Sequence, residues 1–279
     1  MTPRTTVQNA ELALLLEVTG TPKPGNVDRE REFEDLRFEH FMAGAVGSRP
    51  GLERAAGGEP VGEAFERAVE GMAQQSAGNT QFGALLLLAP LAAAASRDAL
   101  SQSGVDELVR ETTVADAAGF YRAFEHVDVA VDEPPEGMEP LDVRRGGDAV
   151  PALEDRGLTL FDIMARSEDI DGVAAEWTGQ FDRVFTAADA ILADTGPVPD
   201  RASRAFIDLL AAERDTFVVT RNGPAAAEEV RRRARAVKAG EEDAGELADE
   251  LVERDINPGT TADIVAGALF VALERGLVV

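Results

Sequence analysis

The chain has 279 residues, and its 52 acidic and 27 basic side chains give a formal net charge of −25. Such an acidic surface repels nucleic acid and anionic membranes, so we expect neither as a partner. Hydrophobic residues make up 44% of the sequence, which is too much for a disordered chain. Cysteine is absent and His40 and His126 are the only histidines, which argues against thiolate chemistry, histidine triads and multi-histidine metal centres.

The location and the salt requirement also follow from composition. No signal segment opens the chain, and its longest apolar run, Phe82 to Ala95, contains Pro90 and is too short to cross a bilayer. We therefore expect a cytoplasmic protein. Abundant acids with only two lysines are typical of a halophilic protein whose self-repulsion is screened by concentrated salt.

Apolar residues recur at helical spacing along nearly the whole chain. The spacing predicts helices over residues 7–18, 38–46, 61–75, 81–96, 105–111, 114–124, 160–167, 170–194, 201–214, 224–238, 244–253 and 261–277. Only two short segments alternate as strands do, Val127 to Val131 and Phe217 to Thr220. We predict an all-α fold, a compact bundle of roughly ten to twelve helices.

Domain organisation is predicted to be simple. Residues 1–279 are expected to form a single all-helical domain, because both halves of the chain contribute to the site predicted below. A proline- and glycine-rich connection near residues 132–157 is expected to run over its surface. A homodimer is one arrangement that the sequence permits.

The segment from Thr21 to Arg29 reads Thr-Pro-Lys-Pro-Gly-Asn-Val-Asp-Arg and holds one of the two lysines. Prolines on both sides of Lys23 stiffen the backbone, and the following glycine permits a close approach to a ligand. The segment is thus predicted to present Lys23, Asn26, Asp28 and Arg29 to a ligand. A tight turn after the first helix is the simpler alternative.

Acidic residues follow this loop, among them Asp28, Asp35 and Glu39. Most acids of this stretch are expected to face solvent. Asp28 and Asp35, however, flank a loop that carries two cations. Carboxylates combined with water and substrate phosphates suit Mg²⁺, so a magnesium site is one hypothesis for this region.

A second glycine-marked turn, Gly78-Asn79-Thr80-Gln81-Phe82-Gly83, precedes an apolar helix. Asn79 or Thr80 can cap that helix, and the exposed N–H groups of a helix start can hold a phosphate. Uncharged hydrogen-bonding side chains cluster here in a chain otherwise rich in charge, which favours a binding role beside the capping role.

Two further turns have the same design. In Asn257-Pro258-Gly259-Thr260-Thr261-Ala262-Asp263, Thr260 and Asp263 have the spacing of a capping box, although Asp263 can equally hold a cation that bridges to phosphate. In the segment from Asp215 to Pro224, Pro224 fits the first position of a helix, and Arg221 just before it can contact a phosphate. An exposed arginine in a turn between helices is the alternative.

These four segments, in this order and with helices between them, resemble the triphosphoribosyl-dephospho-CoA synthase family, also described as ATP:dephospho-CoA triphosphoribosyl transferases. The resemblance runs from Glu17 to about Phe270 and favours a halophilic, archaeal-type member. It implies transfer of the 5-triphosphoribosyl group of ATP to the 2′-hydroxyl of 3′-dephospho-CoA, with release of adenine. The implied partners are therefore ATP and dephospho-CoA or a related acceptor.

The resemblance also suggests roles for single residues. Lys23, Arg29 and Arg221 would clamp the triphosphate, and Mg²⁺ on Asp28, Asp35 and Asp263 would neutralise the remaining charge. Asp28 or Asp35, with Glu39 in reserve, would take the proton of the acceptor hydroxyl. The other predicted substrate-binding residues are Gly25, Asn26, Asn79, Thr80, Gln81, Gly259 and Thr260.

This chain differs from the bacterial members of the family at one turn. Where they carry Asn-Thr-His-Lys-Gly, it has Asn79-Thr80-Gln81-Phe82-Gly83, which leaves the identity of the acceptor open. Two other readings of the four turns stay open. One is a different magnesium-dependent transferase or hydrolase that uses a nucleotide, and the other is a non-catalytic helical protein whose turns are only caps.

Overall fold

The computed structural model describes residues 4–131, 134 and 138–279, and these residues are helical without any strand. They form fifteen α-helices and two short 3₁₀ helices. The all-α prediction is confirmed, whereas the predicted ten to twelve helices are too few.

Up to residue 149 the chain contains α1 (Thr6–Thr19), α2 (Phe38–Ala56), α3 (Val61–Met72), α4 (Phe82–Ala95), α5 (Gln102–Arg110), α6 (Val114–Ala123), and the 3₁₀ helices η1 (Glu139–Leu141) and η2 (Val143–Ala149). The remainder contains α7 (Val150–Arg156), α8 (Leu160–Ser167), α9 (Gly172–Thr178), α10 (Asp182–Ala193), α11 (Val198–Ala212), α12 (Thr216–Asn222), α13 (Pro224–Lys238), α14 (Ala244–Glu253) and α15 (Gly259–Glu274).

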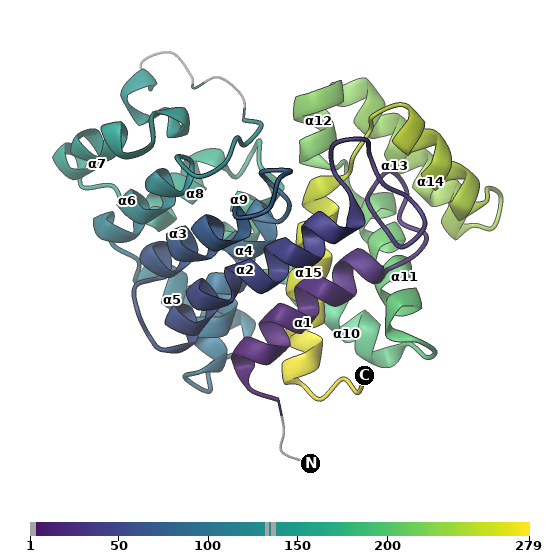
Figure 1. The fold of residues 1–279 in the computed structure, drawn as a ribbon, viewed down its shortest axis with the longest axis horizontal. Helices are drawn as coiled ribbons and strands as arrows, with labels where there is room; N and C mark the ends of the chain where they lie inside the picture. The colour runs from purple at the N-terminus through teal and green to yellow at the C-terminus, as the bar shows by residue number, and fades with distance from the viewer. Residues whose placement is uncertain (1–3, 132–133, 135–137) are drawn as a thin grey trace.

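Two apolar helices form the centre of the molecule. α4 carries leucine and alanine on all its sides, and α15 is buried along almost its whole length. A helix that is apolar all round is stable only when other helices surround it. α15 accordingly packs against α1, α4, α10 and α11 and runs between a group formed by α5–α8 and a group formed by α10–α14 (Figure 1).

The structure corrects three predicted elements. The long helix predicted over residues 170–194 is divided into α9 and α10, because Gln180 and Phe181 adopt left-handed backbone angles. The strand considered over Phe217 to Thr220 lies within α12, where Asp215 caps the helix start. Residues Val127 to Val131 also form no strand.

The predicted connection at residues 132–157 is only partly irregular. It contains η1, η2 and α7, so its described part has more helix than its prolines and glycines suggested. Residues 132–133 and 135–137 of this stretch lie outside the described residues.

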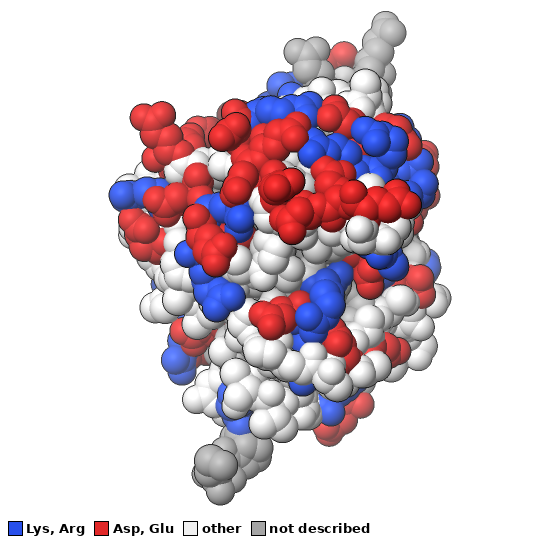
Figure 2. Space-filling model, turned by 90° about the vertical axis from the view of Figure 1, so that its right-hand side faces the viewer, with Lys and Arg blue, Asp and Glu red and all other residues white. Residues whose placement is uncertain are grey.

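Acidic and basic side chains are interspersed over the face seen in Figure 2. Many of the arginines pair with acidic side chains. Arg254, for example, contacts both Glu229 and Glu250. Such exposed pairs contribute little stability singly, so the fold rests mainly on its apolar centre. In the described part of the chain, no helix is both long and apolar enough to cross a membrane.

Candidate active site

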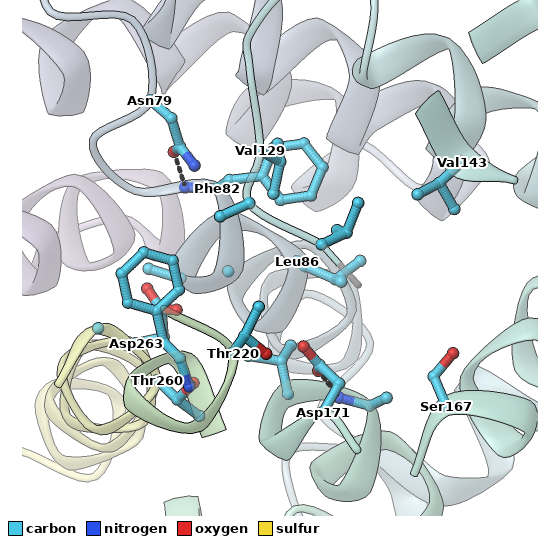
Figure 3. Close-up of a pocket in the computed structure, with 18 of the residues that line it drawn as sticks. Asn79, Phe82, Leu86, Val129, Val143, Ser167, Asp171, Thr220, Thr260 and Asp263 are labelled. Atoms are coloured by element: carbon cyan, nitrogen blue, oxygen red, sulfur yellow. Dashed lines mark hydrogen bonds between the residues drawn. The ribbon is translucent and has the colours of Figure 1, made fainter. Parts of the chain in front are cut away.

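A cavity of about 360 Å³ opens between α4, α6, α8, α9 and the start of α15. Its wall has two kinds of surface, as Figure 3 shows in part. Asp263 and Thr260 lie on one side of the close-up, and Val143 and Ser167 on the other. The polar wall includes Glu17, Asn26, Asn79, Thr80, Gln81, Asn257, Thr260 and Asp263. The apolar wall includes Phe82, Phe120, Tyr121, Phe124, Val129, Leu141, Ile163 and Met164.

All four turns singled out in the sequence contribute to this cavity or brace it. The first turn contacts the last directly: the Asn26 amide donates to Asn257 Oδ1 at 2.8 Å. Gly25 has a φ of +75°, and a Cβ there would lie 2.2 Å from the carbonyl oxygen of Ile256. Gly25 therefore permits the close packing of two backbone segments, whereas the sequence suggested an approach to a ligand.

Lys23 points into the protein and is fully buried. Its ammonium group pairs with Glu17 on α1 and donates to Asn26 Oδ1 at 2.9 Å. We call Glu17, Lys23, Asn26 and Asn257 the Lys23 cluster. Burial raises the pKa of Glu17, and the nearby Lys23 opposes that shift. The cluster is thus a satisfied buried ion pair, and Lys23 is not itself among the residues of the cavity wall.

Asp28 is also buried, and its oxygens are engaged by the chain around it. The backbone N–H groups of Lys23, Glu30 and Arg31 donate to its carboxylate at 2.8–3.0 Å. Arg31 adds a side-chain contact of 3.3 Å. Asp28 therefore holds the turn in shape, and these donors occupy the lone pairs that a proton or a metal ion would need.

The remaining predicted side chains of this region lie outside the cavity wall. Asp35 and Glu39 are exposed, and Arg29 is exposed with its Nε 3.2 Å from Thr21 Oγ1. Arg221 is in the last turn of α12, is 54% exposed, and lies 3.9 Å from Asp255. The structure does not bring the proposed clamp of Lys23, Arg29 and Arg221 together at the cavity.

The start of α15 is capped by an aspartate from another segment. Asp215 Oδ2 accepts the Thr261 N–H and the Thr261 hydroxyl, each at 2.7 Å, while Asp215 Oδ1 accepts the Val218 N–H and caps α12. Thr216 and Thr260 share a hydrogen bond of 2.9 Å. Burial raises the pKa of Asp215, and its hydrogen bonds to Thr261 oppose the shift. Asp215 thus joins α12 to α15, a bridge that no local sequence pattern indicated.

The start of α4 has a comparable arrangement. Asn79 Oδ1 accepts the N–H of Phe82, the first residue of α4, at 3.1 Å (Figure 3), although the N-cap position itself is occupied by Gln81, which makes no side-chain cap. Asp263 of α15 lies beside the N–H of Ala84, which stabilises the charged form of its carboxylate. A Cβ on Gly83 would lie 2.1 Å from Asp263 Oδ2, so only glycine leaves room for this carboxylate. Asp263 and Gly83, which stand in separate motifs of the sequence, are therefore a matched pair.

Asp263 is also electrostatically unusual. Desolvation raises its pKa well above the ordinary aspartate value, and the charges of Glu17 and Asp215 raise it further. The Ala84 N–H opposes this shift. A carboxyl group that binds its proton more tightly than an exposed aspartate is suited to proton transfer in a general acid or base.

Thr80 and Gln81 are the other notable part of the polar wall. The hydroxyl of Thr80 and both amide atoms of Gln81 are buried without a hydrogen-bond partner among the described residues. Phe82 beside them packs edge-on to Phe65 and Phe124, with ring centroids 5.0 and 4.9 Å apart. Thr80 and Gln81 therefore have polar side-chain atoms without hydrogen bonds, whereas Phe82 belongs to the apolar wall.

The wall also holds charged residues that were not predicted from the sequence, namely Glu17, Asp142, Arg166 and Asp171. Glu17 and Arg166 lie within helices, where no local pattern marks them, whereas Asp171 precedes Gly172 at the start of α9, a glycine-marked helix start that was overlooked. Asp171 accepts the Ala174 N–H at 2.7 Å and caps α9. Arg166, on the exposed side of α8, is the one basic residue among the described residues of the wall.

The three carboxylates predicted to hold magnesium are not gathered into a site. Asp28 is engaged by N–H donors, Asp35 is exposed away from the wall, and Asp263 alone lines the cavity. Among the residues that the structure describes, no group of three metal-ligating side chains is close enough to hold an ion. The donor set does not fit the predicted site, although magnesium itself stays a prediction.

The fold and this site define an all-helical protein with a cavity. One part of the cavity wall is polar and the other is apolar, which suits a small ligand that has both kinds of surface. A solved structure from Archaeoglobus fulgidus, a proposed triphosphoribosyl-dephospho-CoA synthase, is similar to it, with a TM-score of 0.70 and 26% identity. The match covers 86% of this chain and 99% of the other. No curated protein matches in sequence.

A family model described as CitG, ATP:dephospho-CoA triphosphoribosyl transferase, matches residues 3–278. The chain therefore belongs to the ATP:dephospho-CoA triphosphoribosyl transferase family and is a transferase of this class. The resemblance stated from the sequence motifs is confirmed.

Proposed function

We propose that the cavity is the active site at which this chain transfers the triphosphoribosyl group of ATP to the 2′-hydroxyl of 3′-dephospho-CoA. The observation that carries the proposal is the convergence of the four turns on one cavity whose wall holds Asp263. The polar wall offers hydrogen bonds for ribose and phosphate, and the apolar wall suits a purine ring or a long acceptor arm.

The reaction breaks the C1′–N bond between ribose and adenine and forms a C1′–O bond to the acceptor. It passes through an oxocarbenium-like state, as glycoside cleavage does. The hydroxyl proton must leave as the new bond forms, and the departing adenine must gain a proton. A carboxylate in the cavity that takes the hydroxyl proton and then donates a proton to the departing adenine serves both needs.

We assign this role to Asp263 by comparing the carboxylates of the wall. Glu17 is paired with Lys23, Asp171 caps α9, and Asp142 is bound by Arg144. Burial raises the pKa of Asp171 too, but the pKa of Asp263 is the one raised well above the ordinary value, and Asp263 lies beside Gly83 at the start of α4. This assignment replaces Asp28 and Asp35 as proposed bases, because one is enclosed by donors and the other is exposed.

Two finer features belong to the same proposal. Phosphates of bound ATP would reach the cavity from its open side, where Arg166 is the nearest basic residue of the wall. The excess of acidic residues makes this approach dependent on salt, which screens the net charge of −25. We expect helical circular dichroism to fall when molar salt is replaced by millimolar salt, and an unchanged spectrum would contradict the halophilic character.

Chromatography of the products tests the function. Purified protein with ATP and dephospho-CoA should release adenine in equal amount to the transferred product. Asp263→Asn should lower the rate by roughly 10²- to 10⁴-fold, the usual contribution of a general acid or base. Asp35→Asn is the matched control and should leave the rate unchanged. Phosphate or pyrophosphate without adenine, or an active Asp263→Asn variant, would contradict the proposal.

A further inference from the structure

Polar atoms that lack partners mark one part of the cavity wall. Gln81 is only 3% exposed, yet both its amide oxygen and its amide nitrogen lack a partner among the described residues. The hydroxyl of Thr80 beside it is buried and unpaired as well. Buried polar atoms are almost always hydrogen-bonded in native proteins, so three unpaired atoms in adjacent side chains require an explanation.

These side chains lie in a recess that a glycine creates. A Cβ on Gly44 of α2 would lie 2.6 Å from Thr80 Oγ1 and 3.1 Å from Gln81 Oε1. Met72 closes the recess, and its sulfur accepts the Gln81 backbone N–H at 3.2 Å. We call Gly44, Met72, Thr80 and Gln81 the Gly44 recess. Its surroundings offer the Gln81 amide no hydrogen bonds.

Gln81 can leave this recess by rotation of its own side chain. It is the residue just before α4, it belongs to the cavity wall, and its long side chain has three torsions. An unpaired buried amide raises the free energy of the resting conformation. Turning toward a ligand that offers a matching donor and acceptor removes that penalty.

We infer that Gln81, assisted by Thr80, is a specificity-determining side chain that binds an adjacent donor and acceptor pair on the ligand. A carboxamide presents one donor and one acceptor side by side, the pattern that reads the amino group and ring nitrogen of adenine. An amide group in the acceptor arm offers the same chemistry. This inference rests on the proposed function, because it assigns a ligand group to the same cavity.

Calorimetric titration with two probes distinguishes the two ligand groups that could supply the donor and acceptor pair, the adenine ring and an amide of the acceptor arm. ATP carries the adenine edge without an amide, and 4′-phosphopantetheine carries amides without a purine. Gln81→Met keeps an unbranched side chain of similar length but removes both polar atoms. We expect the variant to lose roughly 10- to 100-fold in affinity for one probe and to keep its affinity for the other, since two hydrogen bonds are lost.

Purine riboside triphosphate, which lacks the amino group of adenine, tests whether Gln81 binds the adenine of ATP. If the adenine edge is the source, wild-type protein should bind ATP more tightly than this analogue, and Gln81→Met should bind both equally. Thr80→Val should show a smaller loss in the same arm. Gln74→Met is the matched control, because Gln74 is exposed and bonds its amide to the Glu70 carbonyl.

A melting measurement distinguishes ligand binding from a structural role. Gln81→Met should melt at the same temperature as wild type or higher, since it removes two unsatisfied buried atoms. Unchanged affinity for both probes, or a general loss of affinity together with a lower melting temperature, would overturn the inference. The affinity and melting measurements do not require turnover. If wild-type protein binds ATP but releases no adenine, the proposed function is contradicted while the inference about Gln81 is not.

Discussion

Two buried polar groups line the same cavity and differ in how well they are satisfied. In the Lys23 cluster, the ammonium group pairs with Glu17 and Asn26, and Asn26 bonds to Asn257. In the Gly44 recess, Thr80 and Gln81 have polar side-chain atoms without partners among the described residues. A complete network stabilises a particular packing, whereas an incomplete one costs stability unless something else completes it.

This difference teaches how to interpret polar residues in glycine-marked turns. Lys23 stood out in the sequence because lysine is so rare, yet its partners are internal and its turn joins α1 to the start of α15. Gln81 stood out less, and its atoms remain available for a ligand. We therefore expect mutations in the Lys23 cluster to affect mainly folding, and mutations near the Gly44 recess and Asp263 to affect mainly binding and turnover.

The largest effect is expected for Lys23→Met. The substitution leaves the Glu17 carboxylate buried without its cation, which costs about 3–5 kcal/mol of unfolding free energy. Chemical denaturation in constant high salt measures this loss. The double variant Lys23→Met with Glu17→Gln should recover a large part of it. If Lys23→Met keeps its stability and loses only ATP affinity, Lys23 is a clamp residue and the comparison fails.

Gly83→Ala should have an intermediate effect on stability and a large effect on turnover. The new methyl group would lie where Asp263 Oδ2 now lies, and such overpacking costs about 1–3 kcal/mol. Displacing the carboxylate from the α4 start should lower adenine release by at least tenfold. Adding Asp263→Ala should restore stability but not activity. Full activity in Gly83→Ala would show that the position of Asp263 is unimportant.

The smallest effect is expected in the pH dependence of the unfolding stability, compared between wild type and Asp263→Asn. Because the native pKa of Asp263 is raised, the unfolded chain loses this proton first as pH rises above about 4. Wild-type stability therefore declines as pH rises from there through the native pKa, and the asparagine variant lacks this decline. Denaturation midpoints between pH 4 and 8 should show the variant gaining relative stability. A constant or falling difference would contradict the raised pKa.

Much of the fold was predictable, because the spacing of apolar residues gives helices directly. The ranges of α13 and α14 were predicted to the residue. The division at Gln180 and Phe181 was not, since neither residue type usually adopts a positive φ. The helix α12 was missed because its run of valine, phenylalanine and threonine favours a strand, and tertiary contacts through Thr216 and Asp215 outweigh that preference.

The sequence predicted which segments form the candidate site better than it predicted the role of each side chain. The four turns do meet, and Asn79 bonds to the first N–H of α4, although Gln81 rather than Asn79 or Thr80 occupies the N-cap position. The direction of a side chain is decided by partners far away in sequence, as Glu17 decides it for Lys23. Asp28 likewise bonds to N–H groups whose arrangement appears only in the folded turn. Arg166 within α8 carried no local signal, and Asp171 was overlooked although it precedes Gly172 at the start of α9.

The crystal structure of the protein with bound ATP is the most direct test of this account. The account predicts the nucleotide in the cavity with its ribose C1′ beside Asp263, and with Lys23 still paired to Glu17. A nucleotide whose phosphates contact Lys23, Arg29 and Arg221 outside this cavity, with Asp263 remote from the ribose, would contradict it.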